Sequence, residues 1–515
     1  MRAKRTSLLL GGCLLALGTG AAGAASALHS AGPAYASRVA STAASRVAST
    51  AASRVASISA SQGGRSRAVQ EFVRVEGSLA ALTDVTLIDG TGAPARPHQT
   101  VLLRDGLIDW IGPAAGAAIP AGAEVLELAG HAVLPGLVMV HEHMFYPSGQ
   151  GAYNQMQFSF PRLYLAGGVT TLRTGGSRDP YGDLNLKAAI DAGQIPGPRM
   201  DVTGPYVNGP GLGILFVNAV DGPGDAAALV DYWAGEGATS FKAYMHISRA
   251  ELAAALEVVH GRGLKMTGHL CSVTYAEAAE LGIDNLEHGF TAATDFVTDK
   301  QPDVCPPGRA RTDALLDLDV EGAEVQALFR TLIDNDVAVT STLPVFEIGT
   351  PGRPMAPAAA LDAMAPDARD RYMRQWARVA QGNSADAVAA FAKNMAMEKA
   401  FADAGGLLVA GTDPTGYGGV VAGYANHRQV ELLVEAGFTP EEAIEISARN
   451  GARYLGIDGR TGSVEVGKAA DLMVVRGNPA AEIADIREVV LVFKDGIGFD
   501  ATALFASVKG TVGIH

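Results

Sequence analysis

The feature that most constrains the fold is a regular alternation of short apolar segments with amphipathic stretches between about residue 135 and residue 455. The apolar segments predict strands over 137–140, 170–173, 199–203, 240–243, 265–268, 285–287, 337–340 and 407–410. The stretches between them predict helices, for example over 249–260, 275–281, 387–404 and 440–451. Such a strand–helix alternation predicts a (β/α)8 TIM barrel with its chemistry at the C-terminal ends of the strands. A doubly wound sheet is the alternative, but the Gly-rich phosphate loop typical of that fold is not evident.

The segments on either side of the expected barrel are rich in strand patterns. Residues 69–134 contain a hairpin pattern that turns at Asp105-Gly106, and residues 456–515 contain a second one that turns at Asp495-Gly496. Asp-Gly is a preferred pair for two-residue hairpin turns. Two β-rich segments that flank one domain pair most simply with each other. We therefore expect a small β-sandwich built from both chain ends, beside a barrel over 135–455.

The first residues have the pattern of an export signal. Basic Arg2, Lys4 and Arg5 precede an apolar run over 8–17, and small residues follow. This pattern predicts a signal peptide over 1–27, with cleavage as late as residue 36, and a periplasmic or secreted mature protein. Residues 37–60 repeat a small-residue octapeptide that buries too little surface to fold, which predicts a flexible linker over 37–68. No later segment is long and apolar enough to predict a membrane span.

Charge and cysteine content exclude some classes of function. The net charge of −14 argues against a nucleic-acid-binding protein, which needs a basic face, so the expected partner is a small-molecule substrate. After signal cleavage only Cys271 and Cys305 remain, too few for a disulfide framework. We expect Cys271 to be an inert, partly buried thiol, with pairing of the two cysteines in an oxidising compartment as the alternative. The sequence leaves the oligomeric state open.

Side chains able to bind a metal stand where the expected strands end. His141 and His143 follow the first strand, and at this spacing both project from one face while Glu142 points to the other. The ends of later strands carry, in order, Lys242, His269, His288 and Asp413. Each residue alone has an ordinary interpretation, such as a strand-end cation, a helix cap or a turn residue. Nitrogen and oxygen ligands that converge on one rim predict a metal centre suited to zinc.

With these residues in place, the chain resembles the amidohydrolase superfamily over nearly everything after residue 75. The matching motifs are Leu134-Pro135-Gly136-Leu137 before His141-x-His143, Phe241-Lys242-Ala243-Tyr244, Gly268-His269, Glu287-His288-Gly289 and Gly411-Thr412-Asp413. The lysine on the fourth strand is similar to that of the imidazolonepropionase-like and prolidase-like branch, which includes dipeptidases. One departure is Met139, which stands where the family usually has an acidic residue. The residue at that position does not bind metal, so the predicted ligands are all still present. The contacts around the ligands can differ from those of the family.

The resemblance implies a binuclear centre of divalent ions, most simply Zn2+. The implied ligands are His141, His143 and Asp413 for one ion and His269 and His288 for the other. Lys242, carboxylated by CO2, would bridge both ions, because an unmodified ammonium does not fit among divalent cations. A hydroxide between the metals would attack the substrate, and Asp413 would carry the proton to the leaving amine. Tyr244 would donate to the developing oxyanion or hold the substrate, unless it only packs.

Substrate contacts are less sharply indicated. The candidates are Tyr206, Asn208, Arg173 and His246, which lie at strand ends or in the loops after the strands. Arg173, or an arginine of Gly308-Arg309-Ala310-Arg311, could hold a substrate carboxylate with two hydrogen bonds. The Asp- and Pro-rich stretch 291–320 has the length of a loop that covers an active site as a lid.

These observations predict an exported, binuclear metal-dependent amidohydrolase that cleaves a C–N bond, for instance in a dipeptide or an N-acyl amino acid. Hydrolysis of a lactone, an ester or a cyclic amide, or deamination, are alternatives on the same fold. Deaminases of the superfamily generally lack the strand-four lysine, so Lys242 counts against deamination. An alternative of another class is a non-catalytic scaffold, in which ligand positions would be replaced; here all of them are present. A serine hydrolase is disfavoured because no Gly-x-Ser-x-Gly elbow occurs.

Overall fold

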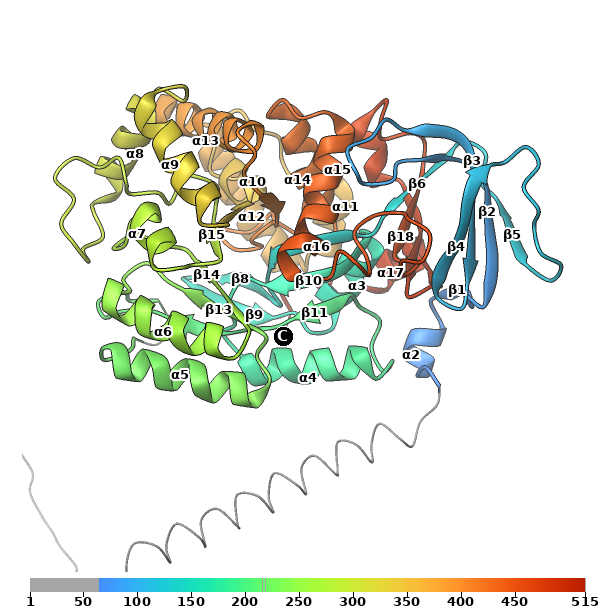
Figure 1. Ribbon diagram of the computed structural model, residues 1–515, viewed down its shortest axis with the longest axis horizontal. Helices are drawn as coiled ribbons and strands as arrows, with labels where there is room; N and C mark the ends of the chain where they lie inside the picture. The colour runs from blue at the N-terminus through green and yellow to red at the C-terminus, as the bar shows by residue number, and fades with distance from the viewer. Residues whose placement is uncertain (1–63, 215, 218, 515) are drawn as a thin grey trace, which may run out of the picture. The chain divides into compact units, whose positions relative to one another are not determined.

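Strands from both chain ends join one nine-stranded sheet in the computed structural model of the protein (Figure 1). The structure describes residues 64–214, 216–217 and 219–514. The predicted signal peptide, and the predicted linker up to residue 63, lie outside these residues. Helix α2 (Arg67–Gln70) begins inside the range predicted as linker. The strands of the sheet are β1 (Val73–Val75), β2 (Leu79–Leu87), β3 (Arg96–Arg104), β4 (Leu107–Pro113), β5 (Glu124–Glu127), β6 (His131–Pro135), β18 (Leu472–Arg476), β19 (Val489–Lys494) and β20 (Ile497–Asp500).

The pairing of the two chain ends occurs between β6 and β18, which run antiparallel in register from Leu472 opposite Pro135 to Arg476 opposite His131. The strand order is β1-β20-β19-β18-β6-β2-β3-β4, with β5 beside β2. One hydrophobic core draws on both chain ends, with Leu82 from the first part and Val474 from the second. The structure does not confirm a sandwich of two sheets, because the described strands hydrogen-bond into one sheet.

Both predicted Asp-Gly hairpin turns are confirmed. Asp105 and Gly106 connect β3 to β4 with φ angles of 49° and 83°. Asp495 and Gly496 connect β19 to β20 with φ angles of 51° and 80°. Positive φ at both central residues is what a type I′ turn requires, and this turn matches the twist of the flanking strands.

Between the two parts of this sheet, parallel strands follow one another in chain order. They form a three-stranded sheet, β11-β10-β7, and a six-stranded sheet, β12-β13-β14-β15-β16-β17. Their bounds are β7 (Leu137–Glu142), β10 (Val169–Thr174), β11 (Arg199–Asp201), β12 (Thr203–Val207), β13 (Ser240–Ala243), β14 (Lys265–Gly268), β15 (Asn285–Glu287), β16 (Ala338–Ser341) and β17 (Leu408–Ala410). A separate hairpin, β8 (Phe145–Gly149) with β9 (Ala152–Gln155), follows β7. The predicted strands are thus all present, the third of them divided at Val202.

The predicted closed barrel is only partly realised. Among the described residues, no ladder joins β11 to β12 or β17 to β7, so the strands form two open sheets. The first and last strands nevertheless meet at their C-terminal ends, because the amides of Thr412 and Asp413 donate to the His141 carbonyl at 3.1 and 3.0 Å. These two bonds lie beyond the end of β17, which stops at Ala410. Ligand positions on β7 and after β17 are therefore neighbours.

Helices follow the strands and cover the outside of the two parallel sheets (Figure 1). Their bounds are α3 (Ser159–Ala166), α4 (Pro180–Asp191), α5 (Pro223–Glu236), α6 (Arg249–Gly261), α7 (Tyr275–Glu280), α8 (Gly308–Asp317), α9 (Ala323–Asp334), α10 (Leu343–Glu347), α11 (Ala358–Ala363), α12 (Pro366–Ala380), α13 (Ala385–Asp403), α14 (Tyr424–Glu435), α15 (Pro440–Ser447), α16 (Arg449–Leu455), the 3-10 helix η1 (Ile483–Arg487) and α17 (Ala501–Ser507). The start of α6 is fixed by a capping box between Ser248 and Glu251. The helix predicted over 440–451 is two helices, α15 and α16, divided at Ala448. No helix in the described part of the chain has the length and apolar character needed to cross a bilayer.

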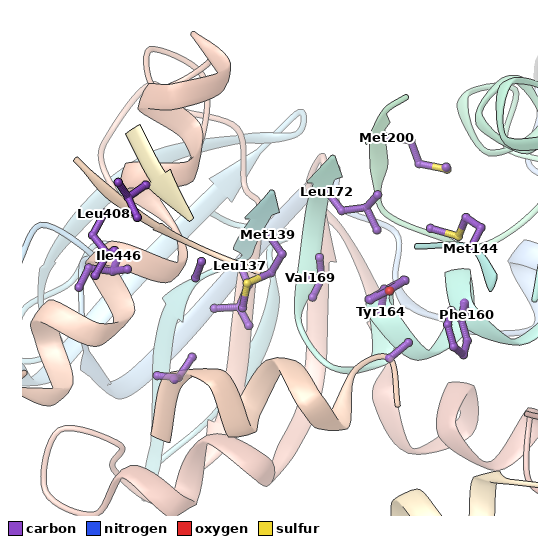
Figure 2. Close-up of a cluster of buried hydrophobic side chains, with 14 of the residues drawn as sticks. Leu137, Met139, Met144, Phe160, Tyr164, Val169, Leu172, Met200, Leu408 and Ile446 are labelled. Atoms are coloured by element: carbon purple, nitrogen blue, oxygen red, sulfur yellow. The ribbon is translucent and has the colours of Figure 1, made fainter. Parts of the chain in front are cut away.

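The main hydrophobic core includes side chains of β7, β10 and helix α3. Leu137, Met139, Val169 and Leu172 are fully buried there and lie close together (Figure 2). Burying such side chains contributes roughly 1.5–3 kcal/mol each. Met139, the departure from the family pattern, is therefore an apolar core residue.

Candidate metal centre

All six residues of the predicted metal set lie at the C-terminal ends of parallel strands. His141 is in β7 and His143 follows it, Lys242 is in β13, His269 follows β14, His288 follows β15, and Asp413 follows β17. C-terminal strand ends of parallel sheets meet on one side, so side chains there can converge.

Asp413 is the point on which the histidines converge. Its Oδ1 lies 3.2 Å from His143 Nε2 and 3.8 Å from His141 Nε2, and its Oδ2 lies 3.9 Å from His288 Nδ1. His141, His288 and Asp413 each offer a ligand atom, and these atoms lie within 4.8 Å of one another. Lys242 Nζ is 3.2 Å from His141 Nε2. The arrangement could hold a metal ion.

His269 joins the cluster through ring contacts. Its ring centroid is 4.4 Å from that of His288, and His288 is in turn 4.8 Å from His141. His269 is half-buried, whereas His141, His143 and His288 are buried. It is therefore the most open histidine of the set.

Hydrogen bonds at Nδ1 orient the rings. His141 Nδ1 lies 2.6 Å from Glu287 Oε2, and His143 Nδ1 lies 3.1 Å from the Gly176 carbonyl. A carboxylate and a carbonyl can only accept, so both Nδ1 atoms donate and both Nε2 atoms keep a lone pair. His288 Nδ1 lies 2.8 Å from Thr342 Oγ1. Such partners fix the tautomer and orientation of metal-binding histidines.

Burial sets the charge state of the cluster. It lowers the pKa of His143 to about 4 and that of His269 to about 3, and it lowers the pKa of His288 well below its ordinary value. These imidazoles are neutral near pH 7, which is the form that binds metals. Burial also lowers the pKa of Lys242 to about 8.

The carboxylate of Asp413 stays ionised in these surroundings. Burial alone would raise its pKa, but His141 and His143 hold that pKa well below the usual range. Glu287 behaves alike, because His141 and Arg173 outweigh its burial and keep its pKa well below normal. The centre thus combines ionised carboxylates with neutral imidazoles, a donor set that fits a divalent cation.

The backbone is left-handed at two of the candidate ligands. His288 has φ of 72° and Asp413 has φ of 50°. Such conformations cost of order 1–3 kcal/mol in residues other than glycine and persist where the surrounding structure imposes them. His288 directly follows β15 and Asp413 comes three residues after the end of β17, so both left-handed residues lie just beyond a strand end.

Two glycines make room for the His141 ring. A Cβ atom on Gly175 would lie 2.3 Å from His141 Cδ2, and one on Gly411 would lie 2.4 Å from His141 Cβ. A larger residue at Gly175 would clash with the His141 ring, and one at Gly411 would clash with the Cβ and backbone of His141.

The two tyrosines predicted near the centre lie beside Lys242. The Tyr244 ring is 5.0 Å from the His269 ring and 4.9 Å from the Tyr206 ring, between centroids. Lys242 Nζ is 5.8 Å from the Tyr206 centroid and 5.9 Å from the Tyr244 centroid. Tyr244 is half-buried and Tyr206 is buried, so Tyr244 is the more open of the two phenols.

The predicted role of Arg173 in binding a substrate carboxylate is at odds with the structure. Its side chain is fully buried and donates to the Val140 carbonyl, to Tyr454 Oη and to Glu287 Oε1, at 2.6, 2.7 and 2.6 Å. All of its charge is neutralised inside the protein. Arg173 supports Glu287, and through it the ring of His141.

The predicted substrate contact Asn208 is also occupied within its own loop. Its Oδ1 accepts from the amide of His246 at 2.9 Å, and its Nδ2 donates to the Gly209 carbonyl at 2.7 Å. His246 Nδ1 lies 3.2 Å from the Pro210 carbonyl. Asn208 therefore ties the loop after β12 to the loop after β13, and both polar atoms of its buried amide already have a partner within the protein.

Sequence reasoning missed the groups that hold the ligands. Glu287 and Thr342 position His141 and His288, and Phe145 stacks on the His143 ring at 4.3 Å. Glu287 carried a signal, because an acidic residue beside His288 at the end of a buried strand needs a charged partner. The orientation of Glu142 was predicted from its position in the strand. It points away from the two histidines and accepts a hydrogen bond from Asn426 Nδ2 at 2.9 Å.

The two cysteines form a disulfide, which corrects the expectation of an inert thiol. Cys271 and Cys305 have Cα atoms 4.8 Å apart and are 34 residues apart in the chain. Cys271 follows β14 closely, and Cys305 lies in the predicted lid stretch 291–320, which contains helix α8. The disulfide fixes this stretch to the rim near His269.

Comparisons with known proteins agree with these motifs. Residues 358–497, which include Asp413, match the model of the amidohydrolase family. A putative prolidase from Bifidobacterium longum is 26% identical and has a TM-score of 0.59, with 84% of this chain and 99% of that chain covered. No protein of curated function matches the chain in sequence.

Two further solved structures share the fold at lower identity. A Xaa-Pro dipeptidase with methionine bound in its active site is 20% identical, with 82% and 100% of the two chains covered and a TM-score of 0.60. Bottromycin amidohydrolase is 22% identical, with 84% and 91% covered and a TM-score of 0.63. The family match and the shared fold agree with the histidine, lysine and aspartate positions at the strand ends. Residues 358–497 of this chain are thus similar to the amidohydrolase family, and the chain resembles a putative prolidase in sequence and fold and a Xaa-Pro dipeptidase in fold.

Proposed function

We propose that this protein is an exported, binuclear metal-dependent amidohydrolase that cleaves the C–N bond of a peptide-like or N-acyl amino-acid substrate. The observation that carries the proposal is the convergence of His141, His288 and Asp413 around one point, with Lys242 against His141. Buried imidazoles and an ionised carboxylate are costly to place together without a partner, because burying polar groups that lack partners is unfavourable. A divalent ion would supply the missing partner.

The residues divide into two ligand sets in this proposal. His141, His143 and Asp413 would hold one ion, and His269 and His288 the other. Zinc suits these nitrogen and oxygen donors. Glu287 and the Gly176 carbonyl favour the proposal, since they leave Nε2 of His141 and His143 free to coordinate.

Lys242 would bridge the two ions after carboxylation. As an ammonium it would repel them, but burial lowers its pKa to about 8, which makes the neutral amine accessible. The amine nitrogen would form a bond to the carbon of CO2 and lose a proton, which leaves a carbamate anion with two oxygen donors. Lys242 is buried, with Tyr206 and Tyr244 beside it, so this group would be shielded from water.

Divalent ions in such a centre lower the pKa of water and polarise the substrate carbonyl. Asp413, held ionised beside His143, would accept a proton from the attacking water and deliver it to the nitrogen of the leaving amine. Tyr244, half-open beside His269, would donate its hydroxyl proton to the carbonyl oxygen as negative charge develops there.

The C–N bond is proposed from the relatives. Their printed names include a prolidase, a Xaa-Pro dipeptidase and bottromycin amidohydrolase. Export is supported by the N-terminal pattern and by the Cys271–Cys305 disulfide, because structural disulfides persist in oxidising compartments.

A rate screen tests the activity. Protein loaded with zinc and bicarbonate would be assayed against dipeptides, N-acyl amino acids, cyclic amides and lactones, with Asp413→Asn as the inactive control. We expect the dipeptides or N-acyl amino acids to be hydrolysed fastest. A clear preference for lactones would contradict the C–N assignment. If the metal-loaded protein hydrolyses none of these compounds, the result would favour the alternative of a non-catalytic scaffold.

The bridging lysine has its own test. Lys242→Ala should lose metal and activity together, and short carboxylic acids should restore part of both, because their carboxylate can occupy the place of the carbamate. Undiminished metal content in Lys242→Ala would refute the bridging role.

A further inference from the structure

A cavity of about 370 Å³ lies on the same side of the fold as the candidate metal centre. Three elements line it: helix α12, the β8–β9 hairpin that follows His143, and the segment Gly416–Tyr417 that follows Asp413. Its size is that of a pocket for a small ligand or for part of one. No residue of the metal set lines it.

Arginines make up one wall of this cavity. Arg371, Arg374 and Arg378 are three, four and seven residues apart along α12, so they share one helical face. Within the described part of the chain none of the three takes part in an ion pair or a hydrogen bond. Arg353 and Arg428 nearby differ, since both pair with Glu347 at 2.7 Å. A chain with 54 acidic and 40 basic residues has ample acidic groups to pair with arginines, yet these three face the cavity unpaired.

Aromatic contacts connect the cavity to the metal centre. Tyr153 lines the cavity and packs edge-on against Phe145, at 5.3 Å between ring centroids. Phe145 stacks on the ring of His143 at 4.3 Å. Burial raises the pKa of Tyr153, and the negative charge of Asp413 raises it further. Two aromatic rings, Tyr153 and Phe145, therefore connect a ligand in the cavity to the candidate metal ligand His143.

We infer that this cavity binds a second, side-chain carboxylate of the substrate, so that the enzyme prefers peptide-like substrates with an acidic amino acid. Guanidinium groups bind carboxylates with two parallel hydrogen bonds, and several arginines on one face give such a site both charge and geometry. The cavity suits one amino-acid side chain in volume, and the net charge of −14 disfavours a nucleic acid as the occupant. The inference rests on the proposed function and names its substrate class.

Paired substrates test this selectivity. Dipeptides and N-acyl amino acids that contain Glu would be compared with the isosteric Gln compounds, using the metal-loaded protein. We expect kcat/KM to favour the Glu member by about tenfold or more at low salt, and the preference to shrink as salt screens the charges. The Arg371→Gln/Arg374→Gln double variant should bring the ratio close to one. Arg330→Gln, which removes an exposed arginine from α9 outside the cavity, is the charge-matched control and should retain the ratio.

Equilibrium binding separates this inference from the proposed activity. Glutarate, which has no amide bond, would be titrated into the same three proteins by calorimetry. The double variant should bind it about tenfold more weakly than wild type or Arg330→Gln do. Equal glutarate binding in all three proteins, or a Glu preference that survives in the double variant, would overturn the inference. If the double variant loses glutarate binding but the wild-type protein hydrolyses no amide, the result would support the arginine cavity and contradict the proposed activity.

Discussion

Two aspartates with left-handed backbones, Asp495 in the chain-end sheet and Asp413 at the metal centre, show how differently the two regions use one conformation. Asp495 has φ of 51° and is followed by Gly496 in a hairpin turn. Its carboxylate pairs with Arg199 and Arg460, each at 2.7 Å. Asp413 has φ of 50°, is followed by a proline, and among described residues forms ion contacts only with histidines.

We propose that this difference separates a structural charge, Asp495, from a functional one, Asp413. In the sheet, turn sequence, backbone conformation and charge pairing all agree, which is typical of residues that specify a fold. At the rim the same conformation holds a buried carboxylate among imidazoles, without a permanent cation to neutralise it. Residues that violate local rules in this way are concentrated at functional sites.

The largest expected effect comes from replacing each of the two aspartates by asparagine, one at a time. Asp413→Asn should lower kcat/KM by about a thousandfold or more, because it removes a ligand and the proton carrier. Its free energy of unfolding without metal should change by less than about 1 kcal/mol. Asp495→Asn, the matched control, should leave kcat/KM within about twofold, since it is remote from the centre. Similar losses of activity in both variants would break the comparison. Steady-state kinetics and urea unfolding measure the two quantities.

Glu287→Gln tests whether the centre depends on a buried ion pair. The change leaves Arg173 buried without its partner and should lower the free energy of unfolding by about 3–5 kcal/mol. It should also weaken metal binding by about 10–100-fold, because His141 loses its orienting carboxylate. Glu445→Gln, which breaks the half-exposed pair with Arg449, should cost less than about 1 kcal/mol. A Glu287→Gln protein with full stability and full metal affinity would contradict the orienting role.

His427 extends the comparison to a buried imidazole outside the centre. Its Nε2 lies 2.8 Å from the Gly167 carbonyl, and burial lowers its pKa from 6.5 to about 4. The unfolded chain therefore binds a proton at His427 at a higher pH than the folded protein does. As the pH falls from about 6.5 to about 4, the folded state loses stability, and it regains none at lower pH. The loss should amount to about 3 kcal/mol. In His427→Gln, whose amide can still donate to Gly167, the drop in unfolding free energy from pH 7 to pH 4 should be smaller by that amount. An unchanged drop would show that His427 is not the group responsible.

Gly496→Ala probes the turn itself and should have the smallest effect. Gly496 has φ of 80°, and an added Cβ would lie 2.6 Å from Gly106 Cα. Strain and close contact should lower the free energy of unfolding by about 1–3 kcal/mol. Activity at a temperature where the protein is folded should not change, because this turn lies in the sheet. A loss of kcat/KM without a loss of stability would contradict the division between sheet and centre.

Much of the barrel region could be predicted from the sequence because its strands are short, buried and sharply bounded. The predicted strands 240–243, 265–268 and 285–287 coincide with β13, β14 and β15. The candidate ligands were brought together in the prediction because they lie at or just after the C-terminal ends of parallel strands, and these ends meet on one side.

The features that could not be predicted depend on contacts between residues far apart in the chain. Arg173 lies in a strand, and only the pairing of β10 with its neighbours shows that it points inward to Glu287 rather than to a substrate. The disulfide needed the fold of residues 271–305 to bring both cysteines together. Strand patterns at the chain ends likewise predict that they pair, but not whether the strands form one sheet or two.

The central claim is that the strand-end residues form a two-metal centre bridged by Lys242. Elemental analysis of protein prepared with zinc and bicarbonate tests it directly, with Lys242→Ala prepared alongside. The account predicts about two zinc ions per chain in the wild-type protein and a clear loss of zinc in Lys242→Ala. Wild-type protein that retains no zinc under these conditions would contradict it.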